Sequence, residues 1–79
     1  MEPTNNSQSI NRILVWLKAH GKKIGKESLA GDKDASAVIG QYQLIKSKPW
    51  NNNDPALWAF LCTAIDTYCD SHRMMRPRY

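Results

Sequence analysis

The sequence lacks the features that mark secreted and membrane-spanning proteins. Its first seven residues contain no basic segment followed by an apolar run, so we expect no secretory signal peptide. The longest nearly apolar stretch, Ala56 to Ile65, is much shorter than the roughly 20 residues that a membrane-spanning helix needs. We therefore expect a cytoplasmic protein without membrane association.

Cysteine is also scarce, because the chain contains only Cys62 and Cys69. If both lie in one helix, their Cα atoms are about 10.5 Å apart. A disulfide requires a Cα separation below about 7 Å, so these thiols cannot bridge each other. We expect both to be reduced, which fits a reducing compartment.

Residues arranged for catalysis or cofactor binding are few. The segment Gly21 to Lys26 has three residues between its glycines, whereas a phosphate-binding loop has four. Cys62, Cys69 and His72 share a helical face, but the two thiols are too far apart to hold one metal ion. We therefore expect no metal, no cofactor and no small-molecule substrate.

The sequence offers one candidate nucleophilic pair, with Cys69 as the thiol and His72 as its base. No glycine-rich segment near it offers an oxyanion hole. The carboxylates of Asp66 and Asp70 lie beside Arg73 on an expected polar face, where nothing raises a pKa toward neutrality. We expect a protein without enzymatic activity.

Three segments predict an all-α fold, a compact three-helix domain spanning 1–79 with flexible ends at 1–6 and 73–79. The first helix is expected over 7–20, capped by Asn6 or Ser7 and ended by Gly21. The connection after it is basic, with an extra short turn near 27–30. The apolar stripe of the first helix consists of Ile10, Ile13, Leu14 and Leu17.

The second helix is expected over 35–47, with Asp34 as its N-cap. The alternating pattern over 38–45 also permits a strand, and Gly40 costs a helix about 1 kcal/mol. The third helix is expected over 55–72, because Asp54 suits the cap and Pro55 suits the first helical position. Its wide apolar face suggests that it packs between the other two.

Apolar residues exceed what a core of this size can bury. The surplus residues are Val15, Trp16, Trp50 and Phe60. Several exposed apolar residues together indicate a contact surface for another protein or for a second copy of the chain. We therefore predict a small regulator, inhibitor or adaptor that binds a protein partner or forms a homodimer through the third helix.

The alternative hypothesis is nucleic-acid binding, because the net charge is +4. The residues that would contact phosphates are Lys18, Lys22, Lys23, Lys26, Arg73, Arg76 and Arg78. The range 23–40 is also loosely similar to a helix-turn-helix motif with a recognition helix from Asp34. That helix would present Ser36, Gln41, Gln43 and Lys46 to base edges.

Overall fold

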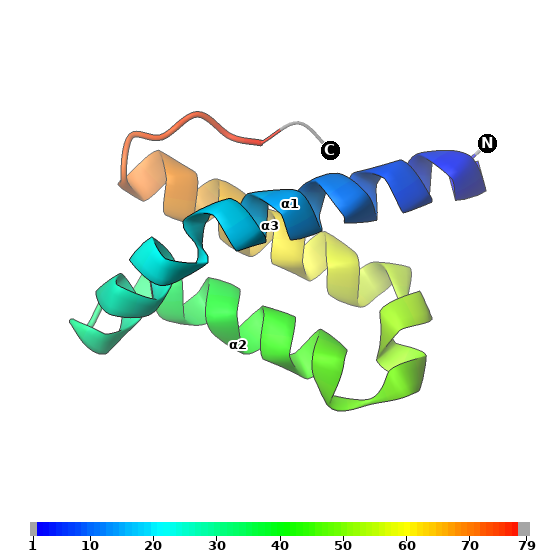
Figure 1. Cartoon of the computed structure of the whole chain (residues 1–79), viewed down its shortest axis with the longest axis horizontal. Coiled ribbons are helices and arrows are strands. Elements are labelled where there is room, and N and C mark those ends of the chain that lie inside the picture. The colour runs from blue at the N-terminus through cyan, green and yellow to red at the C-terminus, as the bar shows by residue number, and fades with distance from the viewer. Residues whose placement is uncertain (1, 78–79) are drawn as a thin grey trace.

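The computed structural model describes residues 2–77, and it describes side chains from residue 9 onward. Three α-helices and one short 3₁₀ helix follow one another as α1 (Glu2–Leu29), α2 (Lys33–Ser47), η1 (Pro49–Asn53) and α3 (Pro55–Ser71). The expected all-α, three-helix fold is confirmed. Because α2 covers 38–45, the alternative strand there is excluded. In the view of Figure 1, α1 crosses α3 and α2 runs beside them.

Helix α1 is longer than expected at both ends. It begins at Glu2, where Pro3 suits the first turn, so Asn6 and Ser7 lie inside the helix instead of capping it. Residues 2–6 are thus helical, and their expected flexibility stays a prediction. Gly21 does not end the helix, and the extra turn expected near 27–30 is the last turn of α1.

The continuation of α1 past Gly21 has an energetic reason. Gly21 and Gly25 each cost a helix about 1 kcal/mol relative to alanine. Ile24, between them, is 2% exposed and belongs to the core, and burying such a side chain contributes about 1.5–3 kcal/mol. The last turn also brings Glu27 to Tyr68 of α3. These contacts offset the cost of the two glycines.

Gly31, with a φ of 99°, is the glycine that ends α1. The amide of Gly31 donates to the carbonyl of Ser28, and the amide of Asp32 donates to the carbonyl of Glu27. This pair of bonds is a Schellman motif, which requires a left-handed residue at the position of Gly31. Asp32 then caps α2, so the expected cap at Asp34 was wrong by two residues.

The start of α3 agrees with the prediction. The side chain of Asp54 accepts a hydrogen bond from the amide of Ala56, and Pro55 occupies the first turn. Before it, the segment expected as a polar loop forms η1. The indole Nε1 of Trp58 donates to the carbonyl of Asn52 over 2.8 Å, which fixes η1 against α3.

The core lies between the three helices and draws on each of them. Close backbone contacts join α2 to both α1 and α3. Helices α1 and α3 meet through side chains, including an edge contact between Trp16 and Tyr68. The fully buried large side chains are Ile13, Ile24, Val38, Ile45, Leu61, Ile65, Tyr68 and Cys69.

The chain after α3 leaves the helical part of the molecule. Residues 74–77 have no regular secondary structure, and Arg78 and Tyr79 lie outside the described residues. The flexibility expected for 73–79 stays a prediction. Within the described part of the chain, no helix is both long and apolar enough to cross a membrane.

Candidate functional site

A polar cluster ties the three helices together where α1 ends and α2 begins. Tyr68 of α3 donates its hydroxyl to Oε1 of Glu27 in α1. His72 places Nε2 at 2.5 Å from Oδ2 of Asp32 and Nδ1 at 3.4 Å from Oε2 of Glu27. Lys23 Nζ lies 3.5 Å from the same Glu27 oxygen. Sequence analysis missed this cluster because its members are far apart in the chain.

The cluster holds its carboxylates ionised. The hydrogen bond from Tyr68 lowers the pKa of Glu27, and the charges of His72 and Lys23 act in the same direction. The backbone amide of Ala35 lowers the pKa of Asp32, and His72 adds to this effect. Burial, with Glu27 as hydrogen-bond partner, raises the pKa of Tyr68. The lowered pKa values keep Glu27 and Asp32 ionised, and the raised pKa keeps the Tyr68 hydroxyl protonated. Groups held in these states suit a structural contact between helices.

The surroundings of Cys69 and His72, the candidate nucleophilic pair, do not suit catalysis. Cys69 is fully buried, and that burial raises the pKa of its thiol, whereas an activated thiol has a lowered pKa. The His72 imidazole faces the carboxylates of Glu27 and Asp32. Among the described residues, no group of three or more histidines, cysteines or carboxylates is arranged to hold a metal ion.

The four residues predicted to bind a partner differ in exposure. Val15, Trp50 and Phe60 expose 68%, 69% and 60% of their surface. Trp16 is half-buried against the core, and its ring lies 4.7 Å from that of His20 and 6.2 Å from that of Tyr68. Trp16 therefore contributes more to packing than to an exposed surface.

Two of the exposed residues belong to η1 and to the first half of α3, and Figure 1 shows the end of α2, η1 and the start of α3 meeting at one end of the molecule. Trp50 is in η1 and Phe60 is in the second turn of α3. Leu44, in the last turn of α2, is 47% exposed, and its carbonyl accepts a hydrogen bond from the Asn51 side chain of η1. We call Leu44, Trp50 and Phe60 the corner patch.

Val15 is not part of the corner patch, whereas Leu44 is part of it but was not among the predicted partner-binding residues. At about 100° per residue, Val15 points roughly 200° away from the buried Ile13, so it is on the outer face of α1. Leu44 is roughly 240° from the buried Val38 around α2 by the same measure. Its position outside the apolar stripe was the available signal for its exposure.

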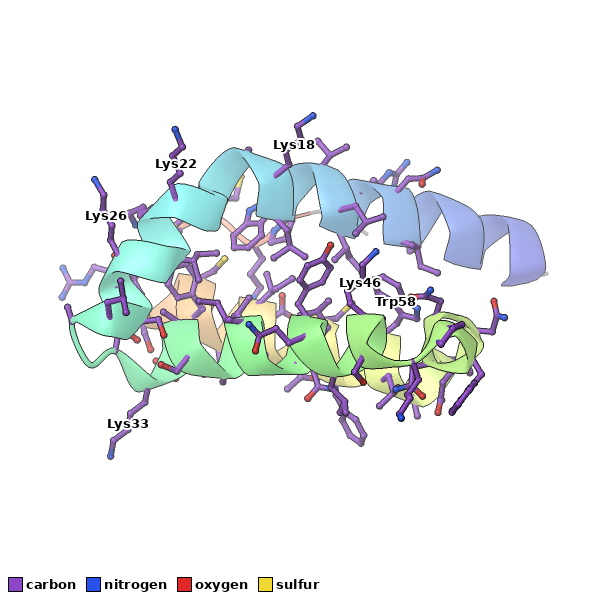
Figure 2. The ribbon with its side chains drawn as sticks, turned by 60° about the horizontal axis from the view of Figure 1, so that its bottom comes forward. Lys18, Lys22, Lys26, Lys33, Lys46 and Trp58 are labelled. Atoms are coloured by element: carbon purple, nitrogen blue, oxygen red, sulfur yellow. The ribbon has the colours of Figure 1, made fainter. Side chains whose placement is uncertain are left out.

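The basic residues do not form one surface. Lys18, Lys22 and Lys26 recur every four residues on the outer face of α1, and Figure 2 shows them projecting away from α2. None of the three forms an ion pair within the described part of the chain. We call them the lysine row. Lys23 instead turns inward, where it contacts Glu27 and lies 5.7 Å from the Tyr68 ring centroid.

The arginines that follow α3 differ from the lysine row. Arg76 forms two hydrogen bonds to the carboxylate of Asp70, at 3.1 and 2.5 Å, and its Nη1 lies 3.9 Å from Asp66. Arg73 is exposed and has a left-handed backbone with a φ of 55°. Arg78 lies outside the described residues. The charge of Arg76 is thus balanced by carboxylates of α3.

Helix α2 was the proposed recognition helix, and two of its polar side chains are engaged within the protein. The Ser36 hydroxyl lies 2.8 Å from that of Ser28 in α1. The amide of Gln41 donates to the carbonyl of Leu57 in α3 over 3.5 Å. Of the four predicted base-contacting residues, Ser36, Gln43 and Lys46 are exposed and Gln41 is half-buried.

An apolar groove of about 270 Å³ opens between α1 and α2. Sequence analysis did not predict it, because it depends on how closely two helices approach each other. Lys46 stands at its α2 side, with Nζ 5.9 Å from the Tyr42 ring centroid. The groove is lined by Leu17, Gly21, Ile24, Val38, Ile39, Tyr42 and Gln43.

Comparison of the chain with protein-family models, with curated proteins and with solved structures finds no match. Three surfaces of the described structure are candidates for contact with other molecules: the corner patch, the lysine row and the groove between α1 and α2.

Proposed function

We propose that the protein is a small non-enzymatic regulator, inhibitor or adaptor that acts by protein–protein contact through the corner patch. The observation that carries the proposal is the exposure of Trp50 and Phe60, at 69% and 60%, outside the buried core. Aromatic residues are enriched in protein interfaces, where they often carry most of the binding energy. Exposing two of them at one end of a small domain favours a partner there.

The cytoplasm is the compartment that we propose for this activity. Cys69 is a buried free thiol. A buried cysteine outside a disulfide fits a reducing environment.

A second copy of the chain is one partner that the corner patch suits. Phe60 lies on the face of α3 that points away from the core, and its neighbours Ala56, Ala59 and Thr63 are exposed and small. Two such faces can pack together around a pair of Phe60 rings in a symmetric dimer. Sedimentation equilibrium over rising concentration separates this homodimer from a complex with another protein.

The proposal is tested by capture with the immobilised protein from a lysate of its own source, followed by identification of the captured proteins. Trp50→Ala and Phe60→Ser should each abolish the specific capture or the self-association. Val15→Ser is the matched control, because it removes an equally exposed apolar residue from the outer face of α1. If all three variants capture the same partner as the wild type, the corner patch is not the contact surface.

Nucleic-acid binding is the second candidate function, and the lysine row supports it. Three unpaired lysines on one helical face can neutralise about three phosphates, which gives weak, salt-sensitive binding. The inward turn of Lys23 changes the design of the test. A Lys23→Glu change would place a second carboxylate beside Glu27 and destabilise the fold, so Lys23 is left unaltered.

The test of the second candidate is fluorescence anisotropy with labelled duplex and single-stranded oligonucleotides across a salt series. Lys18→Glu with Lys22→Glu should weaken binding and flatten its salt dependence. Lys33→Glu is the matched control, because Figure 2 shows Lys33 pointing away from the lysine row. Equal effects of the two charge reversals, or no binding at low salt, would remove this candidate.

A further inference from the structure

We propose that the outer face of α1, with the lysine row at its centre, binds the phosphate backbone of double-stranded nucleic acid without reading its base sequence. The inference rests on the second candidate function, nucleic-acid binding. It deepens that function by naming the form of nucleic acid and the mode of contact. Three features carry it: the segregation of charge along α1, the direction of the row and the side chains around it.

Charge is segregated along α1. Residues 3–26 contain five lysines and arginines and no aspartate or glutamate. Glu27, the first carboxylate after the row, turns inward to a side chain of α3. Asp32 and Asp34, which come next in the chain, also contact side chains at the end of α3. The positive charge on the outer face of α1 is therefore not balanced by α1 itself or by the turn that follows it.

The cations of the outer face have a spacing that suits a row of phosphates. Lys18, Lys22 and Lys26 succeed one another at about 6 Å along the helix axis, and Figure 2 shows all three projecting away from α2. Arg12 is a fourth exposed cation, about 80° from Lys22 around the helix. Phosphates on one strand of a duplex recur about every 3.4 Å of axis. Each of the four long side chains can therefore reach a different phosphate.

The side chains of α1 favour a duplex over a single strand. Surfaces that bind single strands stack unpaired bases on exposed aromatic rings. Trp16 is the only tryptophan, tyrosine or phenylalanine of α1, and it is half-buried against the core. The exposed Trp50 and Phe60 belong to η1 and α3 and not to the helix that carries the row. Cations without a stacking surface suit a backbone whose bases are already paired.

The outer face of α1 has little with which to read bases. Lysines on phosphates fix the position of a protein on a duplex, whereas hydrogen bonds to base edges give sequence specificity. Val15, Ala19 and Leu29, which lie among the lysines on this face, are exposed and apolar. Helix α2, with the predicted base-contacting residues, lies on the opposite side of α1 from the row (Figure 2). We therefore expect binding that is independent of sequence.

Two other anionic surfaces would attract the row less effectively. A helix that binds a lipid surface buries its apolar face in the bilayer, but the apolar face of α1, with Ile13 and Ile24, is buried in the core. An acidic protein would need carboxylates placed to match the row, whereas a duplex carries a charge about every 1.7 Å of its axis and matches in any register. Both surfaces are outcomes of the test.

The experiment measures fluorescence anisotropy of the full chain with labelled duplexes of two unrelated sequences, and with the single strands of each, across a salt series. The two duplexes should bind equally, and each single strand at least about tenfold more weakly. The logarithm of the duplex affinity should fall with the logarithm of salt with a slope of about −3.6, for four phosphate contacts. Duplex affinities that differ more than about tenfold, or tighter binding of the single strands, would overturn the proposal but leave the second candidate function standing. No binding of any oligonucleotide at low salt would remove both.

Variants of the protein locate the binding. Lys18→Gln with Lys22→Gln removes two cations of the row, so the salt slope should become shallower by about 1.8 for both duplexes. Lys33→Gln with Lys48→Gln is the matched control, because it removes the same charge from exposed lysines outside α1. The control should leave the slope unchanged. If the two double variants change the slope alike, net charge and not the row carries the binding, and the proposal fails.

Competition separates the duplex from other anionic partners. Polyglutamate matched to the duplex in total charge should displace the labelled duplex at least about tenfold less effectively than unlabelled duplex does. Equal displacement would overturn the proposal in favour of an acidic protein. Vesicles of phosphatidylserine and phosphatidylcholine provide the lipid surface. Vesicle binding that is tighter than duplex binding, and that Val15→Ser with Leu29→Ser abolishes, would overturn it in favour of a membrane.

One further variant separates this proposal from the corner patch. Trp50→Ala should leave duplex binding unchanged, because Trp50 lies in η1 and not on α1. If Trp50→Ala abolishes oligonucleotide binding while Lys18→Gln with Lys22→Gln does not, the corner patch is the nucleic-acid surface and the proposal for α1 fails.

Discussion

The imidazole of His72, at the end of α3, places its Nε2 2.5 Å from Oδ2 of Asp32, at the start of α2. The other oxygen of the same carboxylate accepts hydrogen bonds from the amides of Asp34 and Ala35, at 2.9 and 3.0 Å. One aspartate therefore begins a helix and also fixes the end of a distant one. This double use distinguishes Asp32 from Asp54, which caps α3.

Asp32→Ala should destabilise the protein more than Asp54→Ala. Loss of a helix cap costs about 1 kcal/mol, which is the effect expected for Asp54→Ala. Asp32→Ala removes a cap and also leaves His72 without one of its two carboxylates. Thermal melts followed by circular dichroism give the comparison. Equal melting temperatures for the two variants would mean that the contact with His72 adds no stability.

Stability should fall in acid because of Glu27 and Asp32. Their pKa values in the folded protein lie below the ordinary values of 4.5 and 3.8. A lowered pKa means that the unfolded chain binds protons first, so the contribution to stability is complete above the ordinary value. It is lost as the pH falls through the lower, folded value. Urea midpoints should therefore be level near neutrality and should decline below about pH 4.5.

Glu27→Gln tests the part of this acid dependence that belongs to Glu27. The amide still accepts a hydrogen bond from Tyr68 but carries no charge to attract Lys23 and His72. The variant should be less stable than the wild type at neutral pH, and the difference should shrink as the pH falls. A difference that stays constant down to pH 2 would contradict the pKa shift of Glu27.

Truncation of Trp58 should destabilise the protein strongly, whereas truncation of Trp50 should have little effect on stability. Trp58 is 9% exposed and its indole bonds to the carbonyl of Asn52, so Trp58→Ala should cost about 3–5 kcal/mol. Trp50 is 69% exposed, so Trp50→Ala should change stability by no more than about 0.5 kcal/mol. Chemical denaturation measures both. A large loss for Trp50→Ala would show that Trp50 is part of the fold and weaken its use as a binding residue.

Two glycine substitutions should have opposite signs. Gly21→Ala should stabilise the protein by about 1 kcal/mol, because the position is helical and a Cβ meets no neighbour. Gly31→Ala should destabilise it by at least about 1 kcal/mol, because Gly31 has a φ of 99° in the turn between α1 and α2. Melting temperatures distinguish the signs. A stabilising Gly31→Ala would contradict the left-handed turn.

The parts of the fold that the sequence predicts are those with a local signal. Asp54 and Pro55, adjacent in the chain, mark the start of α3, and the apolar stripes place Ile13 and Ile65 in the core. The end of α1 is not predictable in this way, because it depends on what Ile24 gains by burial. That gain comes from helices that follow later in the chain.

The candidate surfaces were predictable to different degrees for the same reason. Exposure of Trp50 follows from its polar surroundings, and exposure of Phe60 follows from helical geometry. The inward turn of Lys23 does not, because its partner Tyr68 lies 45 residues away. The groove is the least predictable feature, since it depends on the distance between α1 and α2 and not on any single residue.

The lysine row has a consequence for how the protein meets a partner. Its three charges lie together on the outer face of α1, whereas the charge of Arg76 is balanced at α3. The lysine row concentrates positive charge on the outer face of α1, so long-range attraction should favour encounters in which this face approaches a negatively charged partner first. Such steering accelerates the first encounter even when the final contact is apolar. The rate of association should thus depend on salt more steeply than the rate of dissociation does.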